Sequence, residues 1–298
     1  MTTIKKVLFV TKFQQLGFDA LQALLALKKA DLVHVVFMSV IEREKVAMRR
    51  GVGYKKDEEV KLRETANIRF IDWAEDLFEQ GMEAGVYIVV GSLVSEVMKA
   101  AVKEEADLII IGRSEKGVLE QLYSGSDVVE LIKRTSIPVL VYKHGLDKGA
   151  SVDRPFEKPL VATDWSPASM KAIEYMKGLK NVVEEVHIIH VASQKDLKGT
   201  SSMVVQETRK QARKKLDSIE ADLEKEGIKT RVHVYIGDPV QEIEKAAREH
   251  QASMIVLGSS AKESWTERWL GSVPRKIAEK SDYHTLLIPP EKTKQNKE

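Results

Sequence analysis

The chain has 298 residues, which is long for one compact core, so two domains of ordinary size are expected. Lys and Arg total 47 against 45 for Asp and Glu, and this balance argues against nucleic-acid binding, which relies on an excess of basic side chains. The absence of Cys excludes disulfides, thiolate metal sites and Cys nucleophiles.

Strands and helices are predicted to alternate along the first half of the chain. Phe70, Trp73 and Leu77 are spaced as the buried stripe of one long helix. Apolar runs dominated by Val, Ile and Leu are typical of parallel strands covered by helices on both faces. The runs predict strands at 6–11, 32–40, 86–90, 107–111 and 138–142, with helices at 16–30, 55–83, 92–105 and 126–135.

A segment rich in Gly and charge, residues 143–158, reads as a linker. Beyond it, strands are predicted near 159–163, 183–191, 230–236, 253–257 and 284–288, with helices between them. We therefore expect an α/β protein with domains at 1–145 and 156–292. No stretch approaches the ~20 apolar residues of a membrane helix, and the N-terminal apolar run is too short for a signal peptide, so a cytoplasmic location without a membrane partner is expected.

The two halves repeat each other. The segment GSLVSEVMKAAVKEEADLIIIGRS, starting at Gly91, matches GDPVQEIEKAAREHQASMIVLGSS, starting at Gly237, without a gap. The same spacing pairs Gly125 with Gly271 and IPVLVY, from Ile137, with YHTLLI. Duplication explains this better than chance similarity of two helices, and it predicts two tandem domains. Such domains can face each other like the subunits of a dimer and bury their last strands, PVLVY and TLLI.

Candidate ligand-binding residues follow the predicted strands of the second half. Ligands of open parallel sheets bind beyond the carboxyl ends of the strands. Asp164 ends the first strand, and Gly258 ends the fourth and begins a loop that closes at Gly271 and Ser272, before a helix. Glycine backbone and a helix N-terminus suit a phosphate group, although the same residues also serve as ordinary turn and cap positions.

The full pattern resembles the universal stress protein family. It comprises an Asp after the first strand, a loop of the form G-x2-G-x9-G-[ST] after the fourth, and a final apolar strand. The resemblance spans nearly the whole chain twice. It implies two Rossmann-like domains, each a five-stranded parallel sheet flanked by helices, in a family that binds ATP in some members and no nucleotide in others. It implies adenine and ribose contacts from Ala162, Thr163, Asp164 and Val191, and phosphate contacts from Gly258, Ser260, Ala261, Gly271, Ser272 and Val273.

The chain departs from this pattern differently in its two halves. In the second half Ala261 replaces the second glycine of the loop, which costs about 1 kcal/mol if the backbone there is left-handed. In the first half Lys12 stands in place of Asp164, and Glu115 would repel phosphate from the cradle. We therefore expect a degenerate site in the first half, where Lys12 and Glu115 either pair across the vacated site or are both exposed.

Other conspicuous residues have structural explanations. His34 and His187 hold equivalent places, but a single His in a strand is usually packed, and no second ligand stands at metal-binding spacing, so no metal site is expected. His190 is expected to have a structural role rather than to contact ligand. Trp265 and Trp269 are spaced to share a helical face and to anchor the loop. No nucleophile and base stand together, so any enzymatic activity is limited to slow ATP hydrolysis.

The resemblance implies a stress-responsive regulatory protein that binds ATP or a related adenine nucleotide, with or without Mg²⁺, in its C-terminal domain. The alternative is a nucleotide-independent scaffold for protein interactions in which both sites are degenerate. Under either reading we expect a homodimer or a pseudo-dimeric monomer with protein partners that the sequence does not name.

Overall fold

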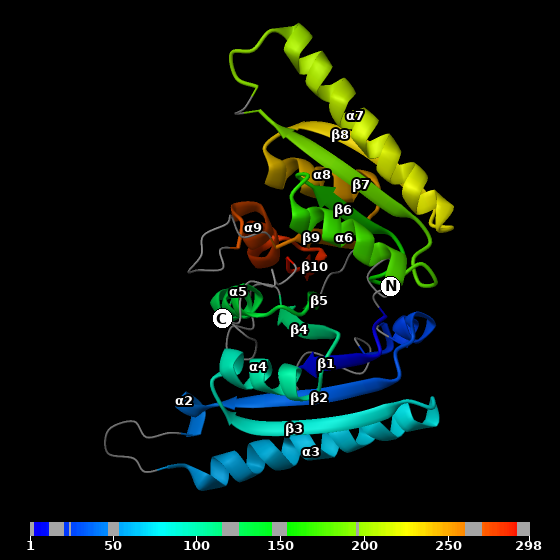
Figure 1. Cartoon of the computed structure of the whole chain (residues 1–298). Helices are drawn as coiled ribbons and strands as arrows, with labels where there is room; N and C mark the ends of the chain where they lie inside the picture. The colour runs from blue at the N-terminus through cyan, green and yellow to red at the C-terminus, as the bar shows by residue number, and fades with distance from the viewer. Residues whose placement is uncertain are drawn as a thin grey trace, which may run out of the picture.

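The computed structural model describes residues 3–11, 21–23, 25–46, 54–114, 125–144, 154–194, 197–259 and 270–290. These residues contain a ten-stranded sheet that runs through the whole molecule, with β3 and β8 at its two edges (Figure 1). The strand order is β3-β2-β1-β4-β5-β10-β9-β6-β7-β8, so the two halves have the same internal order. The strands are β1 (Lys6–Val10), β2 (His34–Glu42), β3 (Glu83–Gly91), β4 (Leu108–Ser114), β5 (Val139–His144), β6 (Pro159–Thr163), β7 (Val186–Ser193), β8 (Thr230–Gly237), β9 (Met254–Gly258) and β10 (His284–Ile288).

Helices cover both faces of the sheet, as expected for strands that are apolar along their whole length. One apolar core lies under a 3-10 helix η1 (Leu25–Ala30) and the helices α3 (Lys56–Glu79), α6 (Pro167–Gly178) and α7 (Ser202–Lys225). The core on the opposite face lies under α4 (Leu93–Lys103), α5 (Gly125–Arg134), α8 (Pro239–Glu249) and α9 (Ser272–Lys280). A short helix, α2 (Arg43–Val46), follows β2. The sequence prediction of two tandem α/β units is confirmed.

The predicted buried stripe of α3 is confirmed as well. Phe70, Trp73 and Leu77 are buried, and the rings of Phe70 and Trp73 pack with Phe37 of β2 at centroid distances of 5.3 and 5.5 Å. The predicted end of this helix at residue 83 is wrong. Gly81, at φ +74°, terminates the helical turn, and the chain is already in β3 at Glu83.

The two halves join through their last strands. β5 and β10 pair in antiparallel fashion, with Leu286 opposite Leu140, whereas within each half neighbouring strands are parallel. The buried ammonium group of Lys143 crosses this junction and donates a 2.9 Å hydrogen bond to the carbonyl of Ala278 in α9. The prediction that the two terminal strands are buried against each other is confirmed.

Several strand and helix boundaries differ from the sequence prediction by a few residues. β7 begins at Val186 rather than 183, because the N–H groups of Val182 and Val183 bond back to the carbonyl of Leu179 and close the turn after α6. The predicted helix at 16–30 contains 3-10 geometry at its described end, η1, and its first residues lie outside the described part of the chain. No helix within the described ranges is both long and apolar enough to cross a membrane.

Candidate functional site

The second half contains a cavity of about 550 Å³ at the carboxyl ends of β6 and β9. These strands are the point at which the strand order of the half reverses, since β7 follows β6 on one side and β10 follows β9 on the other. The walls are mainly apolar, with a few polar groups among them. The lining residues are Ala162, Thr163, Asp164, Ser169, Val191, Pro239, Ile243, Leu257, Gly258, Leu270, Gly271, Ser272, Val273 and Pro274.

Asp164 is held by the tight turn between β6 and α6. Its carboxylate accepts a 3.0 Å hydrogen bond from the backbone N–H of Ser166. Ser166 in turn caps α6, because its hydroxyl accepts the N–H of Ser169 at 3.2 Å. Partial burial opposes ionisation of Asp164, but hydrogen bonds from Ser166 and Ser169 outweigh it and hold the pKa of this carboxyl below its usual value. The cavity therefore has a fixed, ionised carboxylate at its mouth.

Trp165 occupies a strained position directly beside Asp164. Its φ of 66° lies in the left-handed region, which costs a bulky residue about 1–2 kcal/mol. The strain is offset by packing of the indole on the ring of His190, at a centroid distance of 4.7 Å, and by the ammonium group of Lys215 at 5.2 Å. Nδ1 of His190 lies 2.8 Å from the carbonyl oxygen of Thr163. His190 thus contacts both ends of the turn, through Thr163 and Trp165, which agrees with its expected structural role.

The N-terminus of α9 also borders the cavity. Gly271 is the N-cap residue of α9, and among the described residues no side chain caps this helix end. By contrast, α8 is capped by Asp238, whose carboxylate accepts the N–H groups of Val240 and Gln241. Gly271, Ser272 and Val273 line the cavity, so the N–H donors and the positive end of the α9 dipole lie beside it.

Gly258 is required here for a reason of space. A Cβ at this position would lie 2.3 Å from the carbonyl carbon of Ala168 and 2.4 Å from the backbone nitrogen of Ser169. The end of β9 therefore packs directly on the backbone of the first turn of α6. The sequence suggested that glycine serves phosphate approach; close packing between the strand and the helix is a second requirement.

Eight of the ten residues implied by the resemblance line this one cavity: Ala162, Thr163, Asp164, Val191, Gly258, Gly271, Ser272 and Val273. Ser260 and Ala261 lie outside the described residues, as do Lys12, Glu115, Trp265 and Trp269. Further lining residues were not predicted from the sequence, among them Ser169, Ile243, Leu257, Leu270 and Pro274. The helical spacing of Ile243 from Pro239, at the start of α8, could have indicated that both share the side of the helix that lines the cavity.

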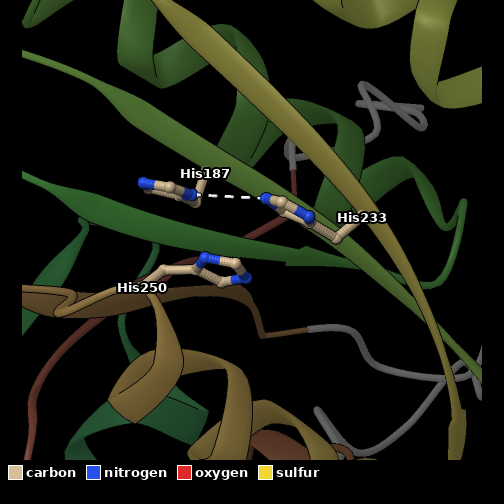
Figure 2. Close-up of side chains that lie close together, drawn as sticks. All are labelled: His187, His233 and His250. Atoms are coloured by element: carbon tan, nitrogen blue, oxygen red, sulfur yellow. Dashed lines mark hydrogen bonds between the residues drawn. The ribbon is translucent and has the colours of Figure 1, made fainter.

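Three histidine side chains form a second cluster on the face of the sheet that α8 covers, and none of them lines the cavity. His187 of β7, His233 of β8 and His250, which directly follows α8, each place a ring nitrogen within 4.8 Å of the others (Figure 2). The expectation that His187 has no second ligand nearby is therefore wrong. Sequence spacing could not show the cluster, because its members come from three separate elements.

The environment of the cluster favours the neutral form of His187 and His233. Burial, followed by the proximity of His250, lowers the pKa of His187, and burial together with both neighbouring histidines lowers the pKa of His233 to about 4. Glu185 stands behind His187. Although burial opposes its ionisation, Arg231 and Lys229 lower the pKa of this carboxyl to about 2.

Comparison with known proteins gives a match over both halves. The model of the universal stress protein family matches residues 3–143 and 155–289. A universal stress protein of Methanocaldococcus jannaschii is 27% identical over 153 residues, covering 45% of this chain and 94% of the relative. The universal stress protein YxiE of Bacillus subtilis is 29% identical over 147 residues, covering 45% of this chain and 99% of its own length.

The tandem arrangement has a counterpart among solved structures. A universal stress protein of Archaeoglobus fulgidus aligns over 97% of both chains with a TM-score of 0.72. The two sequences are 22% identical, so this comparison establishes that the fold is shared and nothing further.

Proposed function

The chain belongs to the universal stress protein family, and from this premise we propose that its C-terminal half binds ATP or a related adenine nucleotide, with or without Mg²⁺, as a regulatory ligand. The observation that carries the proposal is the cavity at the carboxyl ends of β6 and β9. It combines an apolar chamber, an ionised carboxylate and a helix N-terminus that no described side chain caps. Its volume of about 550 Å³ lies in the range of small-molecule sites.

The apolar walls suit a planar base. Val191, Ile243 and Leu257 offer contact surface without competing hydrogen-bond groups. At the mouth, Asp164 can accept hydrogen bonds from the hydroxyl groups of a ribose, which donate well to a carboxylate. The carboxylate is already ionised and oriented by the turn, so little ordering is needed on binding.

The phosphate groups would lie at the N-terminus of α9. Backbone N–H donors and the helix dipole favour an anion there, and the hydroxyl of Ser272 can add a further donor. ATP supplies the negative charge that this end of the cavity can bind; the residues described around it include no nucleophile and base pair. We therefore propose a binding role rather than turnover.

The test is to identify the ligand that the purified protein retains. Mass spectrometry of the supernatant after denaturation should detect an adenine nucleotide, and titration of the emptied protein with ATP should give one site per chain. Replacement Asp164→Ala should weaken binding by at least about tenfold, because a hydrogen bond to a charged group is lost. Lys12→Ala, at the equivalent place of the first half, is the matched control and should bind normally.

The result that contradicts the proposal is wild-type protein that retains no nucleotide and binds none on titration. That outcome would favour the alternative, a nucleotide-independent scaffold built on the continuous sheet. Incubation with Mg-ATP, followed by measurement of ADP, tests in the same samples whether slow hydrolysis accompanies binding.

A further inference from the structure

The three histidines converge because of strand register and helix placement. In the β7–β8 ladder Ile189 pairs with His233, so His233 lies two residues along from the place opposite His187 and points to the same face of the sheet. That face is covered by α8, whose C-terminal cap is His250. Figure 2 shows the rings of all three approaching one another, and Nδ1 of His187 lies 3.5 Å from Nε2 of His233.

Outer partners determine which nitrogen of two rings carries the proton. Nε2 of His187 contacts the Glu185 carboxylate at 3.5 Å, and a carboxylate only accepts, so the proton lies on Nε2 and the lone pair on Nδ1. Nε2 of His250 lies 2.9 Å from the Tyr235 hydroxyl, whose own proton goes to Glu249 at 2.8 Å. His250 therefore also carries its proton outside and leaves Nδ1 as the basic nitrogen.

This arrangement is typical of metal-binding histidines, which donate the second ring N–H to a carboxylate or another acceptor. Two nitrogens bound to one tetrahedral Zn²⁺ at 2.0–2.1 Å stand about 3.3 Å apart, close to the 3.5 Å between His187 and His233. The rings are stacked, with interplanar angles of 14° to 21°, whereas a bound metal ion lies in the plane of each imidazole. Binding therefore requires the rings to turn out of the stack, and the widest nitrogen separation, at most 4.8 Å, must shorten by roughly 1.5 Å.

We infer that His187, His233 and His250 form a binding site for a divalent metal ion of the zinc class, with Glu185 as the positioning residue behind His187. Neutral imidazoles favour zinc, copper, nickel and cobalt ions over magnesium or calcium, which prefer oxygen ligands. Three protein ligands leave a coordination position for water. His233 and His250 are half-buried, so solvent reaches the cluster from their side.

Neighbouring cations are compensated. Arg231 lies 2.6 Å from the Glu185 carboxylate, and Arg213 lies 2.6 Å from Asp217. Since these guanidinium groups are paired with carboxylates, their repulsion of a divalent ion is reduced.

The first half provides an internal comparison. His34 is equivalent to His187. The position equivalent to His233 is occupied by Gly85, because Gly85 pairs with Val36 in the β2–β3 ladder as His233 pairs with Ile189 in the β7–β8 ladder. Glu104 caps α4 where His250 caps α8, and it is engaged by Lys6 and Tyr87. The first half therefore has one imidazole of the three, and the expected stoichiometry is one metal ion per chain.

The test measures metal binding by the full chain without an affinity tag. Protein stripped with a chelator is equilibrated with Zn²⁺, and bound zinc is counted by elemental analysis; Co²⁺ titration followed by visible absorption reports the coordination of the ion. Wild-type protein should bind one equivalent. His233→Gln and His250→Gln should each weaken binding by at least tenfold, and Glu185→Gln by about 10- to 100-fold, as for other outer partners.

His34→Gln is the matched control and should bind metal as wild type does. Far-UV circular dichroism checks that each variant is folded. His187 is only 4% exposed, so its variant can fail to fold, and the two half-buried histidines therefore decide the result. Wild-type protein without stoichiometric zinc, or undiminished binding by folded His233→Gln and His250→Gln, would overturn the inference.

Discussion

Gly258→Ala adds one methyl group where the end of β9 meets α6. The nearest atoms to the new Cβ are backbone atoms of Ala168 and Ser169, at 2.3 to 2.6 Å, and they cannot rotate away as a side chain would. An ordinary contact requires the first turn of α6 to move by about 1 Å. Overpacking of this kind costs typically 1–3 kcal/mol, and we expect a loss near the upper end, about 3 kcal/mol of unfolding free energy.

Gly227→Ala is the matched control, because it adds the same methyl group for a different reason. Gly227 has φ +83°, and nothing lies within 4 Å of a Cβ placed there, so only backbone strain of about 1 kcal/mol is expected. Urea unfolding followed by tryptophan fluorescence measures both variants, and Trp165 at the start of α6 is close to the perturbed contact. A loss for Gly258→Ala no larger than that for Gly227→Ala would refute the steric argument.

Three further predictions concern the second half. The pKa of Asp164 is lower in the folded state than its usual 3.8, so the ionised carboxylate stabilises the fold above that value, and this stabilisation is lost as the pH falls through the lower folded-state pKa. In acid unfolding experiments, the unfolding free energy of Asp164→Asn should therefore fall less steeply below about pH 5 than that of the wild type. Gln251 is exposed and has a φ of 52°, so Gln251→Gly should raise the unfolding free energy by up to about 1 kcal/mol in urea unfolding. A lower unfolding free energy would contradict the strain argument. Leu286→Ala in the buried centre of β10 should lower the unfolding free energy by about 2–5 kcal/mol, and a change below 1 kcal/mol would contradict tight packing at the junction.

Much of the sheet could be predicted from apolar runs and turn residues. β6 and β10 have the bounds that the sequence predicted, because each is a short, continuous apolar run with clear flanking breaks. The internal repeat predicted two tandem domains, for which burial of the two last strands against each other was one expected arrangement. The positions of the predicted strand ends indicated Asp164, Gly258, Gly271 and Ser272, since the carboxyl ends of parallel strands meet at one edge, and the family resemblance implied the other predicted lining residues.

The rest depends on three-dimensional register. Nothing in the spacing of His187, His233 and His250 indicates that they meet; the β7–β8 ladder and the position of the α8 cap bring them together. The role of Gly258 likewise depends on how closely α6 approaches β9, a distance that no local pattern encodes. The end of α3 was predicted too late because Gly81, in the left-handed region, ends the helix before residue 83.

The antiparallel contact of β5 with β10 joins two similar units that share one covalent chain. A pair of separate subunits held by the same contact would come apart at low protein concentration, whereas a tethered pair is held by a high effective concentration that does not depend on how much protein is present. In a homodimer every substitution appears in both subunits, whereas in a tethered pair each unit can change on its own. One unit could therefore keep a carboxylate and gain histidines while the other lost them.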